Sequence, residues 1–137
     1  MQKIFLKVML FYFMEIGVGK TTFIRSLINS LEKIDKKNIS EITSPTFSLM
    51  NQYKLNKFDI HHYDLYRLKS EKDILSLNIF EDISDKIVLI EWPEILGEHK
   101  PKNTIDINFE YGENFNSRYL TISAYEKLKI FDEFKSL

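Results

Sequence analysis

The chain has 137 residues, of which 44% are hydrophobic and 14% aromatic, and this is enough apolar material for one domain with one core. Its 19 Lys and Arg residues nearly balance its 20 Asp and Glu residues, which excludes a broad basic field able to hold a nucleic acid by its phosphates. The lack of cysteine excludes disulfides and thiolate metal sites, so the sequence carries no secretory disulfide signature.

The N-terminal stretch MQKIFLKVMLFYFME places a lysine ahead of an apolar run, which is also how a signal peptide begins. Lys7 interrupts that run, Glu15 ends it, and no small-residue cleavage site follows. No stretch approaches the roughly 20 apolar residues that a transmembrane helix needs. We therefore expect a cytoplasmic protein that makes no membrane contact.

The first elements are predicted to be a strand, a turn and a helix. From Ile4 to Phe13 nearly every residue is apolar on both alternating faces, which is typical of a central strand covered on both sides. A turn with glycines follows, and from Lys20 to about Ile34 apolar residues recur at helical spacing. This order of elements is the context in which a phosphate-binding loop occurs.

Two strands and a short helix are predicted in the middle of the chain. Pro45 biases the residue before it toward extended backbone, so SPTFSLMNQYKL is expected to be a loop that becomes a strand. The stretch FDIHHYDLY predicts a strand that ends near Asp64. In SEKDILSLNIF, Ser70 is followed three positions later by Asp73, which is an N-cap signal for a short helix.

The last part of the chain completes the predicted sheet. DKIVLIEWPE has four consecutive aliphatic residues before Glu91 and is the clearest buried strand. TIDINFEYG and RYLTISAY alternate and flank ENFNS, so they are expected to pair antiparallel, and a closing helix is predicted from Ala124 to Phe134. No repeat or linker divides the chain. We expect a single domain over residues 1–137 with an α/β fold, in which helices flank a mixed sheet with an antiparallel C-terminal edge.

The segment MEIGVGKTT has most of what a phosphate-binding loop requires. Gly17 and Gly19 would let consecutive backbone N–H groups curl around a phosphate, Lys20 would reach the β- and γ-phosphates, and Thr21 would offer a hydroxyl to Mg²⁺. The Walker A pattern has glycine five positions before its Gly-Lys pair, where this chain has Met14. A side chain in a left-handed turn would cost about 1–2 kcal/mol, roughly tenfold in affinity, and less if the backbone stays extended. The alternative is an ordinary helix start after a glycine turn.

Two carboxylates, Asp64 and Glu91, are predicted at the C-terminal ends of strands, where α/β sheets bind their ligands. Each alone is as consistent with a solvated residue at a strand end. Together with Lys20 and Thr21, they make a candidate site for a metal and an attacking water.

Three aromatic side chains near these carboxylates are interpreted more conservatively. His61 and His62 are neighbours on a strand and point to opposite faces, so we interpret them as structural or pocket-rim residues rather than metal ligands. Trp92 is interpreted as a packing residue, with stacking on a base or on a partner as the alternative.

Taken in chain order, EIGVGKTTF, SPTFSLMNQY, HHYDLYRL, IFED and IEWPE resemble the motifs of the TsaE (YjeE) family, small bacterial ATPases of tRNA threonylcarbamoyladenosine synthesis. The resemblance runs from about Phe11 to Glu94, and the later part fits in shape more than in motif. It implies a P-loop NTPase-like fold with ATP and Mg²⁺ as cofactors. The residues it places at the nucleotide are Glu15, where the family usually has Asp, and Gly17, Val18, Gly19, Lys20, Thr21 and Thr22. The catalytic residues it implies are Thr46, which would sense the γ-phosphate, Asp64 and Glu91; the metal ligands it implies are Thr21, Asp64 and Glu91.

The resemblance also implies a role for the chain. The family hydrolyses ATP while engaging the TsaB and TsaD proteins, and TsaD carries the transfer of threonylcarbamoyl to the tRNA, so this chain would meet tRNA only indirectly. The family usually has an additional strand and helix before the loop strand, for which this chain leaves no room. Either translation starts upstream of Met1, or the chain is a shortened copy with weak ATPase activity.

Two other functions stay open at this point. A small P-loop kinase would use Asp64 as the base for a substrate hydroxyl, but it needs a lid with several arginines, and the chain has only Arg25, Arg67 and Arg118. A partner-binding subunit that has lost good nucleotide binding is favoured by Met14 and the short N-terminus. The intact residues Lys20, Thr21, Asp64 and Glu91 oppose that second alternative.

Overall fold

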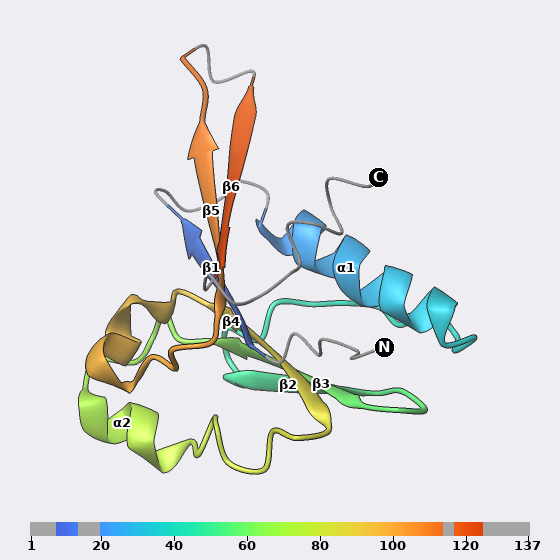
Figure 1. Cartoon of the computed structure of the whole chain (residues 1–137), viewed down its shortest axis with the longest axis horizontal. Helices are drawn as coiled ribbons and strands as arrows, with labels where there is room; N and C mark the ends of the chain where they lie inside the picture. The colour runs from blue at the N-terminus through green and yellow to red at the C-terminus, as the bar shows by residue number, and fades with distance from the viewer. Residues whose placement is uncertain (1–7, 14–19, 114–116, 125–137) are drawn as a thin grey trace.

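The computed structural model describes residues 8–13, 20–113 and 117–124 of the chain, which form a mixed sheet with helices on both of its faces (Figure 1). In chain order the elements are β1 (Val8–Phe13), α1 (Lys20–Ile34), β2 (Met50–Lys54), β3 (Asp59–Asp64), α2 (Glu71–Ser76), β4 (Lys86–Glu91), the 3₁₀-helix η1 (Pro93–His99), β5 (Ile105–Tyr111) and β6 (Arg118–Ala124).

The six strands lie in the order β2-β3-β4-β1-β5-β6. Strands β3, β4, β1 and β5 run parallel to one another, while β2 pairs antiparallel with β3 and β6 pairs antiparallel with β5. The predicted α/β fold with an antiparallel C-terminal edge is therefore confirmed. The second antiparallel edge, formed by β2, was not predicted, because single strands in a sequence do not show their partners.

Strand β1 lies in the middle of the sheet because both of its faces are apolar. Phe11 packs with Ile24 and Ile28 of α1 in one buried cluster. Leu10 packs with Ile74 of α2 and Leu96 of η1 in the other. Figure 1 shows α1 and α2 on opposite sides of the sheet, so the described residues form three layers with two cores.

Most predicted elements form where the sequence indicates. Helix α1 has the predicted bounds, β3 ends at Asp64 and β4 ends at Glu91. Ser70 caps α2 as predicted, since the backbone N–H of Asp73 donates to its Oγ at 3.2 Å. None of the helices in the described ranges is long and apolar enough to cross a bilayer.

The structure differs from the sequence predictions after β4 and at Ala124, and part of the predicted C-terminal helix lies outside the described residues. The 3₁₀-helix η1 was not predicted; it begins at Pro93, directly after Trp92 turns the chain with a left-handed φ of 56°. Ala124 is the last residue of β6 rather than the first of a helix. The rest of the predicted closing helix, and residues 4–7 of the predicted first strand, lie outside the described residues.

Candidate functional site

Asp64 and Glu91 end two adjacent parallel strands and pair with each other in the register of β3 and β4. Both are almost inaccessible to solvent, with 2% and 0% of their surfaces exposed. The end of β4 lies beside the end of β1, because the backbone N–H of Trp92 donates to the carbonyl of Phe11 at 3.3 Å. The two predicted carboxylates therefore lie at the sheet edge where the chain leaves β1 to enter α1, as α/β ligand sites do.

Asp64 holds a loop of the SPTF motif in place. Its Oδ2 accepts hydrogen bonds from the hydroxyls of Thr46 at 3.1 Å and Ser44 at 3.3 Å, and these two hydroxyls lie 2.8 Å apart. Its Oδ1 accepts from the backbone N–H of Tyr66 at 3.0 Å. The structure thus brings two of the predicted catalytic residues, Thr46 and Asp64, into direct contact. It adds Ser44, which sequence reasoning missed.

Arg67 also contacts the loop that contains Thr46. Its guanidinium lies 5.4 Å from the ring centroid of Phe47 and donates to the carbonyl of Thr46 at 3.4 Å. The side chain of Phe47 is 87% exposed to solvent, and its ring forms a cation–π interaction with Arg67. Arg118, another of the three arginines, lies 5.8 Å from the Tyr111 ring centroid. The SPTF and DLYR motifs therefore form one structural unit.

Glu91 lies next to a buried histidine. The Nε2 atom of His62 is 3.2 Å from Glu91 Oε1, and both side chains are fully buried. His62 shares a face of the sheet with Asp64 because the two are separated by one residue on β3. The alternation of side chains along a strand is enough to predict this shared face. The sequence does not give the register between β3 and β4, which places His62 next to Glu91.

His61 lies on the other face of β3, as predicted, with its ring 6.3 Å from that of Tyr63. Burial lowers the pKa of His61 below its usual 6.5, and the positive charge of Lys86 lowers it further, against a smaller opposing effect of Asp59 and Asp85. The two histidines thus have different surroundings on opposite faces of the sheet.

Trp92 packs against Tyr66 in a tilted arrangement, with ring centroids 5.0 Å apart and an angle of 54° between the ring planes. Trp92 follows Glu91, and Tyr66 lies two residues after Asp64, so this aromatic pair links the segments that leave β3 and β4. The prediction that Trp92 packs within the fold is confirmed by this contact. Its left-handed backbone is rare for a bulky residue and is the kind of strain that collects at functional sites.

The predicted phosphate loop falls mainly outside the described residues. Helix α1 begins at Lys20, as predicted, and Thr21 lies in its first turn. Thr22 is exposed and lines a pocket described below. Met14, Glu15, Gly17, Val18 and Gly19 lie outside the described residues, so their nucleotide-binding roles stay predictions.

An open pocket of about 330 Å³ lies beside the first turns of α1. It lies on the β5 side of β1, whereas Asp64 and Glu91 lie on the β4 side. Its lining comes from α1, β5 and β6 and consists of Thr22, Phe23, Ser26, Phe109, Arg118, Tyr119 and Leu120. Sequence reasoning missed this pocket because it depends on how the β5–β6 hairpin sits over α1.

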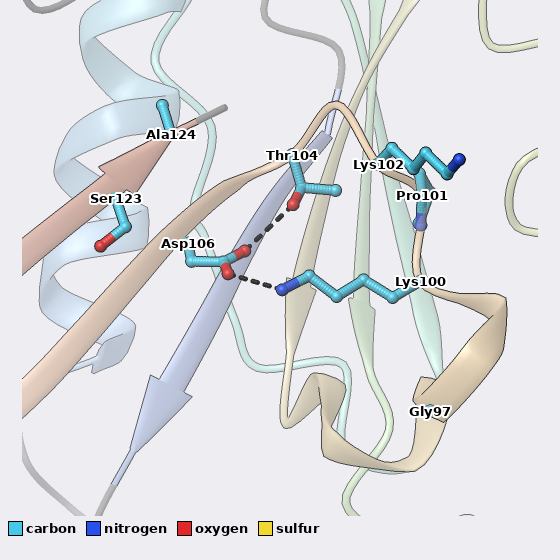
Figure 2. Close-up of a pocket in the computed structure, with 8 residues that line it drawn as sticks. All are labelled: Gly97, Lys100, Pro101, Lys102, Thr104, Asp106, Ser123 and Ala124. Atoms are coloured by element: carbon cyan, nitrogen blue, oxygen red, sulfur yellow. Dashed lines mark hydrogen bonds and ion pairs between the residues drawn. The ribbon is translucent and has the colours of Figure 1, made fainter. Parts of the chain in front are cut away.

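A second pocket, of about 450 Å³, lies on the face of the sheet opposite α1 (Figure 2). Lys100 Nζ lies 2.6 Å from Asp106 Oδ2, and the Thr104 hydroxyl donates to Asp106 Oδ1 at 3.1 Å. In Figure 2 Lys102 extends away from this cluster. The carboxylate of Asp106 is thus satisfied by its own neighbours, so we assign this cluster a structural role.

The described ranges contain no group of three or more His, Asp or Glu side chains that could hold a metal ion. The oxygen donors at the site are the carboxylates of Asp64 and Glu91 and the hydroxyls of Ser44 and Thr46. Such hard oxygen ligands suit Mg²⁺, which often keeps several waters and binds through one or two carboxylates together with substrate phosphates. The donor set therefore fits a magnesium ion that arrives with a phosphate ligand.

Comparison with known proteins gives consistent matches. The family model described as "Threonylcarbamoyl adenosine biosynthesis protein TsaE" matches residues 2–120. The chain is 39% identical to TsaE of Rickettsia conorii over 113 residues, which cover 82% of this chain and 62% of that protein. It is 37% identical to TsaE of Nostoc sp. over 117 residues, covering 81% and 67% of the two chains. The match thus spans less than two thirds of the Rickettsia conorii protein.

The fold also matches a solved structure. YdiB of Bacillus subtilis superimposes with a TM-score of 0.66 at 18% sequence identity, over 95% of this chain and 76% of the YdiB chain. At that identity the match concerns the fold alone. With a family model that covers most of the sequence, and with relatives 37–39% identical to it, the chain belongs to the TsaE family.

Proposed function

We propose that this chain binds ATP with Mg²⁺ and hydrolyses it as an accessory protein of tRNA threonylcarbamoyladenosine modification, together with TsaB and TsaD proteins. One observation carries the proposal: Asp64, bonded to the Thr46 hydroxyl, and Glu91 end adjacent parallel strands, and the end of β4 lies beside β1, the strand that precedes α1 in the chain. A phosphate loop alone hydrolyses nothing, because the reaction also needs a carboxylate for the metal and a group that orients water.

The start of α1 supplies the binding half of the site. Free backbone N–H groups and the positive end of the helix dipole favour a phosphate at a helix N-terminus. In this proposal the segment 15–19 wraps the phosphates, Lys20 offsets their charge and the Thr21 hydroxyl faces the metal. Mg²⁺, when bound with the nucleotide, would neutralise the charge that develops on the transferred phosphate.

In this proposal Asp64 and Glu91 have different roles. Asp64 already holds the hydroxyls of Ser44 and Thr46, so a γ-phosphate entering beside it would compete for these hydroxyls and shift the SPTF loop. Glu91 is fully buried at the end of β4, where a carboxylate could orient a water or the metal's own water ligand. Thr46 would thereby report whether a γ-phosphate is present.

The sheet order sets the direction in which the nucleotide would lie. The two acids are on the β4 side of β1, so the γ-phosphate would point to that side. The nucleoside would then extend to the β5 side, where the pocket lined by Thr22, Ser26 and Tyr119 is open. Its apolar and aromatic lining suits a planar base.

The nearly neutral charge of the chain favours contact with tRNA through partners rather than directly. The curated relatives are described as tRNA threonylcarbamoyladenosine biosynthesis proteins, and TsaB and TsaD are the partners that the family resemblance implies. We propose the same setting for this chain.

The test is a calorimetric titration with ATP and Mg²⁺, alone and with TsaB and TsaD present, followed by measurement of ATP hydrolysis. We expect micromolar binding that Lys20→Ala abolishes, while Lys33→Ala, at the exposed far end of the same helix, leaves binding unchanged. Asp64→Asn and Glu91→Gln should reduce hydrolysis at least tenfold while changing affinity much less.

Each negative result removes a different part of the proposal. Equal ATP affinity in Lys20→Ala and the wild type would refute the phosphate-loop assignment. Wild-type hydrolysis in both acid variants would remove the catalytic roles of Asp64 and Glu91. No binding in either setting would favour a partner-binding subunit that does not use ATP.

A further inference from the structure

The pair formed by His62 and Glu91 is unusual for its burial. Both side chains are completely inaccessible, and the hydrogen bond joins His62 Nε2 to Glu91 Oε1 at 3.2 Å. Buried histidine and glutamate side chains are costly to desolvate unless their polar atoms are paired. The pair lies on the α1 face of the sheet, the same face as Asp64, between the core cluster and the strand ends.

The hydrogen bond fixes which ring nitrogen carries the proton. An ionised carboxylate only accepts hydrogen bonds, so the ring nitrogen that faces an ionised Glu91 donates. The other ring nitrogen, Nδ1, is buried and has no partner within the part of the chain that the structure describes. An unpaired acceptor is less costly there than an unpaired N–H, which agrees with a proton on Nε2.

An unpaired ring nitrogen argues against a purely structural role for His62. A leucine or methionine could fill the same space beside Ile60 and Leu89 without leaving a buried polar atom unsatisfied. What such a residue could not supply is the hydrogen bond to Glu91. Glutamate has three rotatable side-chain bonds, and a fixed donor restricts how its carboxylate is turned.

We propose that His62 is a positioning residue: its Nε2–H holds the Glu91 carboxylate in the orientation that the hydrolytic step needs. This inference rests on the ATPase function proposed above. His62 lies two residues before the end of β3, behind Asp64, so it acts through Glu91 rather than on the nucleotide. Residues that orient a functional carboxylate or ligand are typically worth 10–100-fold in activity.

The test compares His62→Gln with His62→Asn in the full chain, with ATP, Mg²⁺ and the TsaB and TsaD proteins present. A glutamine amide nitrogen can reach the position of Nε2, whereas the shorter asparagine amide stops near Nδ1. We expect His62→Asn to lower kcat about 10–100-fold with KM for ATP within about twofold, and His62→Gln to keep most of kcat. His61→Asn, on the other face of β3, is the matched control and should keep wild-type kcat and KM.

Several outcomes would overturn the inference. Wild-type kcat in His62→Asn would show that Glu91 needs no such partner, and equal losses in the two His62 variants would indicate lost packing. If His62→Asn does not fold, His62→Met decides: it should lower kcat in the wild-type background and no further in the Glu91→Gln background, and a further loss there would refute positioning through Glu91. A wild-type chain that does not hydrolyse ATP would refute the proposed function and this inference together, whereas normal hydrolysis with an unaffected His62→Asn would refute the inference alone.

Discussion

At the scale of single residues, the two neighbouring histidines of β3 differ in their burial and in the charged groups near them. His62 is fully buried beside a carboxylate, while His61 is partly buried beside Tyr63 and near Lys86. Burial and the charge of Lys86 disfavour the protonated form of His61, which makes this residue a source of pH-dependent stability.

His61 should make the free energy of unfolding fall as the pH drops below about 6.5. Its folded-state pKa is lower than the unfolded value of 6.5, so between the two values the unfolded chain binds more protons than the folded chain. Stability is therefore full above pH 6.5 and is lost as the pH falls through the folded-state pKa. Urea unfolding of the wild type and His61→Gln at pH 7.5, 6.5 and 5.5 measures this.

The change in the free energy of unfolding with pH is compared between the wild type and His61→Gln. Other titrating groups contribute equally to both proteins, so the difference reports on His61. The wild type should lose more stability between pH 7.5 and 5.5 than His61→Gln does. If the two proteins show parallel pH profiles, the ring of His61 titrates in the folded chain as it does in the unfolded one.

The residues of the site show what a sequence can and cannot predict. Asp64 and Glu91 could be predicted because each follows a stretch with the local signals of a strand, and each ends that strand. The contacts of Ser44 with Asp64 and of His62 with Glu91 join residues 20 and 29 positions apart. Those contacts depend on loop conformation and strand register, which local patterns do not encode.

At the scale of elements, α2 offers a clean test of a predicted cap. Ser70 has extended backbone angles and its Oγ accepts from the N–H of Asp73 at 3.2 Å. Ser70→Ala leaves that N–H without its capping partner and should lower the free energy of unfolding by about 1 kcal/mol. Urea unfolding followed by circular dichroism measures the loss.

Ser76 provides the matched control because it lies in the same short helix and is the same residue type. Its hydroxyl donates to the carbonyl of Asp73 at 2.7 Å rather than capping an N–H group, and alanine is the better helix former. Ser76→Ala should therefore change stability by less than about 0.5 kcal/mol. Similar losses in Ser70→Ala and Ser76→Ala would mean that the cap contributes nothing specific.

The 3₁₀-helix η1 shows why one element escaped prediction. It needs a left-handed Trp92 before it and a break at Gly97, whose φ of 50° and ψ of −121° suit glycine far better than other residues. Glycine signals a turn in a sequence, but nothing in the residue type of Trp92 signals a left-handed backbone. The surrounding fold imposes it, since the Trp92 N–H donates to the carbonyl of Phe11 of β1 and its ring packs against Tyr66.

At the scale of the whole molecule, the candidate site exists only in the folded sheet. Its parts come from the start of α1, the loop that contains Thr46, and the ends of β3 and β4. The ends of β3 and β4 meet because these strands are parallel neighbours, and β4 lies next to β1, the strand that precedes α1 in the chain. An unfolded chain cannot assemble them, so a nucleotide that uses this site must bind the folded state and stabilise all of it.

The proposed site therefore predicts that ATP with Mg²⁺ raises the melting temperature. A ligand present at a hundred times its Kd stabilises the folded state by about 2.7 kcal/mol, which corresponds to roughly 10 °C for a domain of this size. The shift should grow with the logarithm of nucleotide concentration above Kd, and differential scanning calorimetry measures it. Lys20→Ala should abolish the shift and Lys33→Ala should keep it. A shift that persists in Lys20→Ala would place nucleotide binding elsewhere on the molecule, because a Lys20-dependent site cannot stabilise a chain that lacks this lysine.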